Sequence, residues 1–343
     1  MASWQAAILQ TALRWLVKRR TTIPIDPVKV RRRIHARRLP AALLARITPL
    51  NVNGIGGDRV SLSGLDAESS NLGVLYLHGG GYFFCSPQTH RPMTLGLAAH
   101  LRAPLFVPQY RLAPEAPYPA ALDDAFEVYR HLQAREPQRR WLIAGDSAGG
   151  GLSLALAVRI RDAGLPAPLA LLLYSPWTDL SCSGDSLRRN DHSCSIFTAA
   201  GVRDGARFYR AQYPADHPGI SPLFADLRGL PPMLIFAAKE EALLDDSTRL
   251  VERARAVGVE VMYECVSGVP HVWPIFQRVL PEGRDTMRHT AAFVENLVAR
   301  ADYRASGALG ATDAGGDDTA AAGAVHALDR PCTPAYSASR SVL

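Results

Sequence analysis

The segment WLIAGDSAGGG, residues 141–151, decides how this chain folds. Its first four residues are apolar and predict a short buried strand, and the apolar run at 152–160 predicts a buried helix. Between them lies Gly-x-Ser-x-Gly, the pattern of a nucleophile elbow, in which a tight turn holds Ser147 in a strained conformation. Positions 145 and 149, both glycine here, must then hold small residues. A glycine-rich turn whose serine caps the helix would show the same short pattern, so the rest of the chain has to decide.

Apolar strands and helical patterns alternate on both sides of this segment. Strands are predicted at 73–77, 105–107, 141–144, 169–174, 233–237 and 259–265, and helices at 94–102, 118–133, 247–257 and 285–300. This alternation predicts a mostly parallel sheet with helices on both faces. Residues 51–63 suggest a hairpin. Residues 181–222 are polar with scattered aromatics and no core strand, so we expect them to cap the strand ends, where α/β sites lie.

The two ends of the chain differ in composition from its middle. Residues 4–17 carry apolar residues at helical spacing and predict an amphipathic helix with a basic end. Of the net charge of +6, residues 1–46 contribute +10 (eleven Lys or Arg against Asp26), which leaves −4 for the remainder. From residue 304 onward Ala, Gly, Ser, Thr and Asp dominate, which predicts a disordered or loosely attached tail.

Several classes of protein are disfavoured by the same composition. The basic N-terminal arm lacks aromatic interleaving or a recognised motif, so we predict no nucleic-acid binding, and packing on the body is favoured over contact with acidic lipid. Five scattered cysteines without a C-x-x-C pair predict reduced thiols and a cytoplasmic location. No secretory signal, membrane-spanning run, metal-ligand spacing or phosphate loop is recognised, so neither a metal nor a cofactor is implied.

His78-Gly79-Gly80-Gly81 directly follows the first predicted buried strand. Consecutive glycines let several backbone N–H groups turn toward one point. Upstream of Gly-x-Ser-x-Gly, a strand-end H-G-G-G is typical of the loop that forms an oxyanion hole. We expect the amides of Gly80, Gly81 and Ala148 to be the donors, which stabilise the negative oxygen of a tetrahedral intermediate.

An elbow serine of this kind needs an acid and a histidine later in the chain. The strand at 233–237 leads to Glu240 and Glu241, and because adjacent side chains point apart, only one of them can reach an imidazole. His271 follows the next strand and so faces the same end of the sheet as Ser147, where it can take the serine proton. Three other histidines are rivals, two in the 181–222 segment and one in the last helix: His192, His217 and His289.

Three motifs together resemble the hormone-sensitive lipase family: residues 78–81, the hexapeptide YRLAPE at 110–115, and GDSAGG at 145–150. The resemblance covers about residues 70–300. It implies an α/β-hydrolase fold with a mostly parallel central sheet, helices on both faces and a helical cap. The implied division is an N-terminal cap segment 1–45, a core of 46–180 and 223–303, a cap insertion 181–222 and a disordered tail 304–343.

The resemblance also implies a carboxylesterase that cleaves short to medium acyl esters through an acyl-enzyme. The family's acid begins a pattern like D-x-L-x-D-[D/E], which residues 241–246 match without a gap. That match selects Glu241 over Glu240, with glutamate in place of the usual aspartate, beside Ser147 and His271. In the oxyanion loop His78 and Gly79 accompany the expected donors, Tyr82 and Phe83 are candidates for substrate binding, and the 110–115 hexapeptide braces the loop.

Other activities remain open at this level. The same residues would serve a lactone or amide hydrolase, and some relatives of this fold are non-catalytic small-molecule receptors, which typically lose a triad member. The expected partner is a small-molecule ester, and a homodimer is left open.

Overall fold

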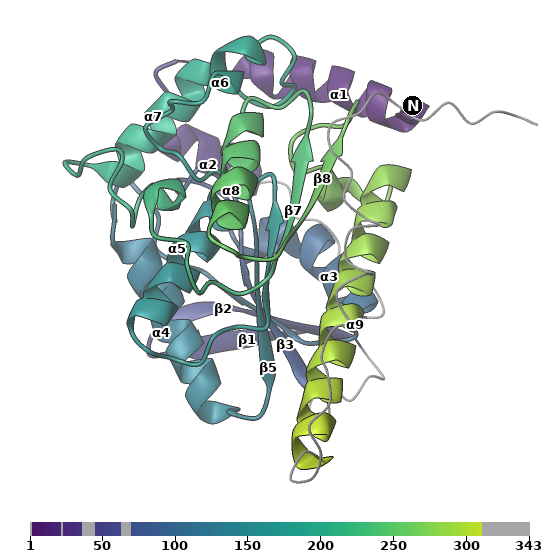
Figure 1. Cartoon of the computed structure of the whole chain (residues 1–343). Helices are drawn as coiled ribbons and strands as arrows, with labels where there is room; N and C mark the ends of the chain where they lie inside the picture. The colour runs from purple at the N-terminus through teal and green to yellow at the C-terminus, as the bar shows by residue number, and fades with distance from the viewer. Residues whose placement is uncertain (1, 22, 36–44, 63–69, 311–343) are drawn as a thin grey trace, which may run out of the picture.

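The computed structural model describes residues 2–21, 23–35, 45–62 and 70–310. Its centre is a sheet whose strands run in the order β1-β2-β4-β3-β5-β6-β7-β8 (Figure 1). The β1–β2 and β2–β4 pairs are antiparallel, and every pair from β4 to β8 is parallel. The strands are β1 Ala45–Val52, β2 Ile55–Leu62, β3 Leu72–Leu77, β4 Leu105–Pro108, β5 Arg140–Asp146, β6 Ala170–Tyr174, β7 Met233–Ala238 and β8 Val261–Val266. The prediction of a mostly parallel sheet is confirmed.

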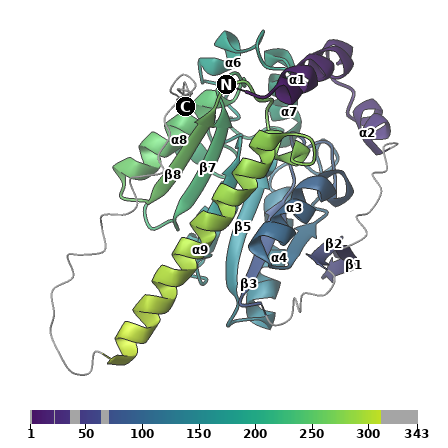
Figure 2. The same cartoon turned by 90° about the vertical axis from the view of Figure 1, so that its right-hand side faces the viewer.

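Helices cover both faces of this sheet. One face carries α4 Ala120–Arg135, α5 Ala148–Asp162 and α8 Leu244–Ala256, and the other carries α3 Arg91–Leu101 and α9 Pro281–Gly310 (Figure 2). Each layer encloses its own core because successive strand residues point to opposite faces. In β5, Ile143 packs under α5, whereas Leu142 and Ala144 belong to the core beneath α3 and α9.

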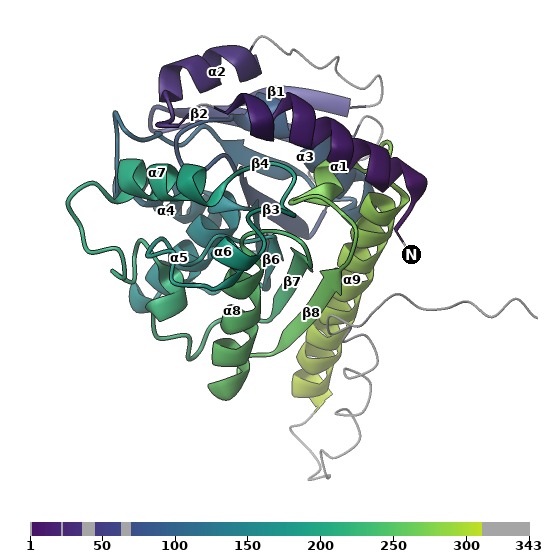
Figure 3. The same cartoon turned by 90° about the horizontal axis from the view of Figure 1, so that it is seen from above.

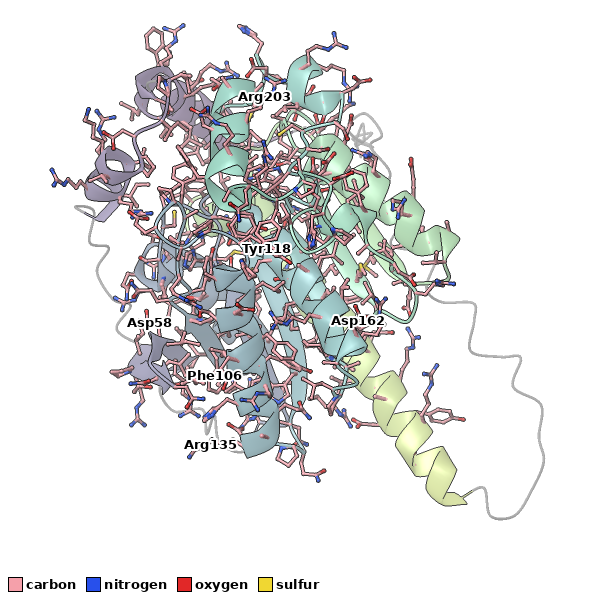
Figure 4. All side chains as sticks on the ribbon, turned by 90° about the vertical axis from the view of Figure 1, so that its left-hand side faces the viewer. Asp58, Phe106, Tyr118, Arg135, Asp162 and Arg203 are labelled. Carbon is pink, nitrogen blue, oxygen red and sulfur yellow. The ribbon has the colours of Figure 1, made fainter. Side chains whose placement is uncertain are left out.

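Figure 4 looks onto the first of these faces. There α4 and α5 run side by side. Tyr118 lies near their upper ends, at the upper edge of the sheet, and Arg135 and Asp162 mark their lower ends. Arg203 lies above them on α7. The upper edge is where the parallel strands end.

Four helices lie over this carboxyl edge, as the view from above shows (Figure 3). They are α1 Trp4–Leu16, α2 Pro27–His35, α6 Ser186–Arg189 and α7 Ala199–Arg210. No strand occurs in residues 181–222, as the sequence predicts. Short 3-10 turns complete the described elements: η1 Lys18–Arg20, η2 Pro87–His90, η3 Pro222–Phe224 and η4 Trp273–Phe276.

The predicted N-terminal helix is α1, and it packs on the body through Ala6, through the half-buried Leu9 and through polar side chains. Ala6 is fully buried. Ser3 hydrogen-bonds to Glu282 at the start of α9, and Gln10 Nε2 donates to the carbonyl of Gly268 at 2.8 Å. Because Gly268 lies three residues before His271, α1 is tied directly to the loop that carries the candidate base.

Three sequence expectations are wrong in detail. The hairpin begins at Ala45 rather than at residue 51, and α9 continues to Gly310, seven residues past the expected domain boundary at 303. The rest of the expected tail, 311–343, lies outside the described residues. Cys85, Cys182 and Cys194 are free thiols, but Cys265 is disulfide-bonded, so the expectation of reduced thiols fails there. None of the helices in the described ranges is long and apolar enough to cross a membrane.

Candidate active site

Ser147 is the single residue between β5, which ends at Asp146, and α5, which begins at Ala148. Its backbone has φ 51° and ψ −122°, in a region that residues with a side chain rarely adopt. Hydrogen bonds hold it there: its N–H donates to the carbonyl of Tyr174 at 2.9 Å, and its own carbonyl accepts from the N–H of Trp177 at 2.8 Å. The predicted strained elbow is therefore present.

The glycines on both sides of Ser147 are required by space. A Cβ on Gly149 would lie 2.0 Å from the carbonyl oxygen of Leu77, the last residue of β3. One on Gly145 would lie 2.3 Å from the carbonyl oxygen of Gly149. The prediction that both positions must be small is confirmed.

The side chains of Glu241 and His271 are in contact. Glu241 Oε2 lies 2.6 Å from His271 Nδ1, both side chains are buried, and Glu241 Oε1 accepts from the N–H of Ala238 at 3.1 Å. Because an ionised carboxylate can only accept, Nδ1 must donate, which leaves Nε2 as the basic nitrogen of the ring. Nε2 is buried, and no residue in the described ranges forms a hydrogen bond with it.

Glu240 points elsewhere. Its carboxylate accepts from the hydroxyl of Ser267 at 2.7 Å and from the N–H of Gly268 at 2.8 Å. It therefore braces the loop before His271, and of the two adjacent glutamates Glu241 is the one that reaches the imidazole. The rival histidines His192, His217 and His289 are not among the described residues that line the cavity around Ser147.

Ser147 and His271 line one cavity of about 320 Å³. Its walls are mostly apolar and come from the N-terminal segment, the 80–90 loop, residues 196–205 and the 271–276 loop, together with Trp177, Leu243 and the elbow. Phe197 packs edge-on against the His271 ring, with the centroids 4.8 Å apart. The hydroxyl of Ser147 and His271 Nε2 form no hydrogen bond in this structure, a bond that often forms only when substrate is bound.

The glycine loop after β3 offers free amides to this cavity. Gly80 and Gly81 line it with φ of 110° and 59°, where a side chain would be strained. The N–H of Gly79 is already used, because it donates to Asp146 Oδ1 at 3.0 Å. Within the described part of the chain, the amides of Gly80, Gly81 and Ala148 donate to no other group. The prediction that these three amides are oxyanion donors stays a prediction.

His78 faces away from the cavity. Its ring is fully buried, stacks on Tyr110 at 4.3 Å, and places Nδ1 2.8 Å from the carbonyl of Gly79. The Tyr110 hydroxyl donates to the carbonyl of His78 at 2.6 Å, so the 110–115 hexapeptide does brace this loop. Burial, reinforced by the nearby His90, lowers the pKa of His78 from 6.5 to about 3, so the ring is neutral.

Of the two aromatic residues expected in the pocket, Phe83 lines the cavity. Tyr82 instead stacks on Tyr209 of α7, with ring centroids 3.7 Å apart, and is not among the lining residues of the described chain. Its side chain joins the loop to α7.

A buried network of hydrogen-bonded side chains lies under the glycine loop, and no local sequence pattern predicts which residues form it. Asp146 Oδ1 accepts from the Tyr76 hydroxyl at 2.5 Å, and Asp146 Oδ2 lies 3.2 Å from His90 Nε2. Burial opposes the ionisation of Asp146, but His90 and Tyr76 outweigh it and hold the pKa of Asp146 below its ordinary value. The Asp146 carboxylate thus ties the turn before Ser147 to Gly79.

Arg31, on α2, is a second connection that the sequence does not reveal. Its guanidinium donates to the carbonyls of Phe83 at 2.7 Å and Ala113 at 2.6 Å, and pairs with both oxygens of Glu115. One side chain thus joins the N-terminal segment to the glycine loop and to the 110–115 hexapeptide. Charge-assisted, bidentate contacts of this kind fix geometry strongly.

Replacement of Gly149 by alanine should disrupt the elbow, because the new methyl would overlap the carbonyl of Leu77. We expect Gly149→Ala to lower the free energy of unfolding by about 3 kcal/mol, as measured by urea denaturation. Gly56→Ala is the matched control, since a Cβ there meets nothing within 4 Å. Equal stability of the two variants would contradict the packing argument.

His78 should also make stability depend on pH. Between pH 6.5 and about 3 the unfolded chain binds a proton at this residue that the folded chain does not. Its contribution to the free energy of unfolding therefore falls as the pH drops, by about 1.4 kcal/mol per pH unit. His78→Asn should flatten this slope in urea denaturation across the upper part of that window. Parallel slopes for the two proteins would refute the assignment.

Comparison with known proteins agrees with this geometry. Residues 74–275 match the family model described as the alpha/beta hydrolase fold. The chain is 41% identical over 229 residues to an acetyl-hydrolase of Streptomyces hygroscopicus, covering 66% of this chain and 77% of the relative. It is 34% identical over 265 residues to an esterase of Acinetobacter venetianus, covering 76% and 86%.

Solved structures give the same result. The crystal structure of EstE5 soaked with p-nitrophenyl butyrate has 35% identity and a TM-score of 0.80, covering 87% of this chain and 100% of that one. An esterase from the bacterial hormone-sensitive lipase family has 33% identity and a TM-score of 0.79, covering 87% and 99%. The chain therefore belongs to the α/β-hydrolase family, among the carboxylic ester hydrolases that resemble hormone-sensitive lipase.

Proposed function

We propose that this protein hydrolyses small-molecule carboxylic esters with Ser147 as nucleophile, His271 as general base and Glu241 as the acid that orients the imidazole. The observation that carries the proposal is the buried 2.6 Å contact between Glu241 and His271 beside a cavity that also holds Ser147. Since Glu241 holds Nδ1, Nε2 is left to take the serine proton.

The reaction then proceeds in two halves. As Ser147 attacks the ester carbonyl, its proton passes to His271, and the negative oxygen is received by the amides of Gly80, Gly81 and Ala148. Each such donor contributes about 3 kcal/mol to stabilisation of the transition state. The imidazolium gives the proton to the leaving alcohol, which leaves an acyl-enzyme on Ser147. Water, activated by His271, then attacks the acyl carbonyl, which releases the carboxylic acid and restores the serine.

Glutamate takes the role of the usual aspartate in this proposal, and its backbone is held by the 181–222 segment. The amide of Asn190 donates to the carbonyl of Glu241 at 2.9 Å and to that of Lys239 at 3.1 Å. Ser193 donates to the carbonyl of Glu240 at 3.0 Å. These contacts anchor the backbone of the turn that carries Glu241.

The proposed substrate is an ester with a short to medium acyl chain. The cavity is mostly apolar, and its volume of about 320 Å³ lies within the range of pockets that bind small ligands. Among the relatives, the Streptomyces protein is named an acetyl-hydrolase, and EstE5 was soaked with a butyrate ester. We assign residues 1–45 and 181–222 to the cap, because both supply cavity walls. The cytoplasmic location stays a prediction from the sequence, and a homodimer is still left open.

Ser147→Ala should abolish turnover of p-nitrophenyl butyrate, with kcat lower by about 10⁶-fold, while the circular dichroism spectrum stays unchanged. An organophosphonate should label the wild-type protein at Ser147, as mapped by mass spectrometry. Turnover retained by the variant would refute the nucleophile assignment.

The two glutamates provide an internal comparison. Glu241→Gln should lower kcat by about 10³- to 10⁴-fold, because the amide no longer stabilises the imidazolium that forms at His271. Glu240→Gln is the matched control, since that carboxylate contacts only the loop before His271, and its kcat should change by less than about tenfold. The reverse order in p-nitrophenyl butyrate kinetics would exchange their roles.

A further inference from the structure

Three bulky apolar side chains of helix α1 point outward, although Leu9 packs against the core. Trp4, Ile8 and Trp15 share one face by their spacing of four and seven residues, and they are 71%, 60% and 56% exposed. The opposite face holds the buried Ala6 and the tether from Gln10 to Gly268. An ordinary surface helix is oriented the other way, with its bulky apolar stripe toward the core.

This exposure is concentrated at the N-terminus. In the described part of the chain, the exposed large apolar side chains outside residues 1–28 are Val257, Val279 and Tyr303, which lie apart in sequence. Within residues 1–28 there are seven: Trp4, Ile8, Trp15, Leu16, Val17, Ile23 and Val28. A cluster of this size, as opposed to scattered single residues, marks an interaction surface.

Positive charge accompanies the cluster. The Arg19 guanidinium lies over the Trp15 ring, 3.7 Å from its centroid, and Lys29 and Arg32 are exposed on α2. The acid in residues 1–46 is Asp26, which pairs with Lys29. We call the exposed set the N-terminal face: Trp4, Ile8, Trp15, Leu16, Arg19, Ile23, Val28, Lys29 and Arg32.

The N-terminal face is the outside of a cavity wall. Val17, Ile25, Val30 and Ile34, from the same helices and their connection, line the cavity that holds Ser147. Figure 3 shows α1 and α2 lying across the carboxyl edge of the sheet. Whatever binds the N-terminal face is therefore held next to the cavity.

We propose that the N-terminal face docks the enzyme onto the surface of an anionic phospholipid membrane. Tryptophan with neighbouring arginine and lysine suits the boundary between headgroups and acyl chains, where rings are buried and cations meet lipid phosphate. Helix α1 has 13 residues and lies on the membrane rather than crossing it. A second copy is disfavoured as the occupant, because a twofold contact would oppose two strongly positive segments.

The test uses the full-length protein and vesicles, without any turnover. Binding is measured by co-sedimentation with vesicles of phosphatidylcholine alone or of an equal mixture with phosphatidylglycerol. We expect at least tenfold stronger partitioning into the anionic vesicles, weakened by salt. Brominated lipid should quench the tryptophan emission, since Trp4 and Trp15 are exposed whereas Trp141, Trp177 and Trp273 are buried.

The decisive variant is the triple substitution Trp4→Ser, Ile8→Ser and Trp15→Ser, which removes exposed side chains that do not line the cavity. It should lose at least tenfold in partitioning. The matched control Val279→Ser with Tyr303→Ser removes equally exposed apolar side chains elsewhere and should bind as the wild type does. All three proteins should hydrolyse p-nitrophenyl acetate at equal rates, so failure of docking and failure of the esterase proposal are distinguishable.

Three outcomes would overturn the proposal. The first is equal or absent binding of the wild type to the two kinds of vesicle. The second is triple-variant binding that matches the wild type. The third is a wild-type dimer in sedimentation velocity that the triple substitution dissociates, which would show that a second copy covers the N-terminal face.

Discussion

The close contact between Gly149 and the carbonyl of Leu77 is the constraint on which the site depends. It brings the first turn of α5 onto the end of β3, with no room for a side chain. The strained backbone of Ser147 and the loop that begins at His78 are therefore parts of one packed unit. Asp146 strengthens this unit, because its buried carboxylate joins the residue before the serine to the amide of Gly79. The serine and its expected oxyanion donors are positioned together.

The parallel pairing of the strands positions the other residues of the site, Glu241 and His271. Strands β3, β5, β7 and β8 end at one edge, so segments far apart in sequence converge there. This is why strand ends alone predict the region of Glu241 and His271. Local patterns such as the glycine loop and the elbow are readable for the same reason: each is required by the backbone of one turn. The choice between Glu240 and Glu241 needs the register of the turn, which the family pattern supplied and the structure supports.

The features that the sequence does not reveal are side-chain contacts between distant segments. His90 meets Asp146 across 56 residues, and Arg31 meets Glu115 across 84, with no local pattern to announce either pair. Tyr82 follows the glycine loop like Phe83, yet its positive φ of 66° sends it toward Tyr209 instead of the cavity. Asp246, in the first turn of α8, accepts from the amides of Thr178 and Asp179. Element boundaries at β1 and α9 also depend on tertiary pairing that composition alone does not encode.

The Arg31 clamp has a consequence for how the enzyme admits and releases its ligands. One guanidinium holds α2 to Phe83, in the segment that follows the free amides of Gly80 and Gly81. Any excursion that lifts α2 to widen the entrance must also remove a support of that segment. A movement of α2 away from the body would therefore also loosen the segment after Gly80 and Gly81, so that access to the cavity and the placement of these amides would be coupled.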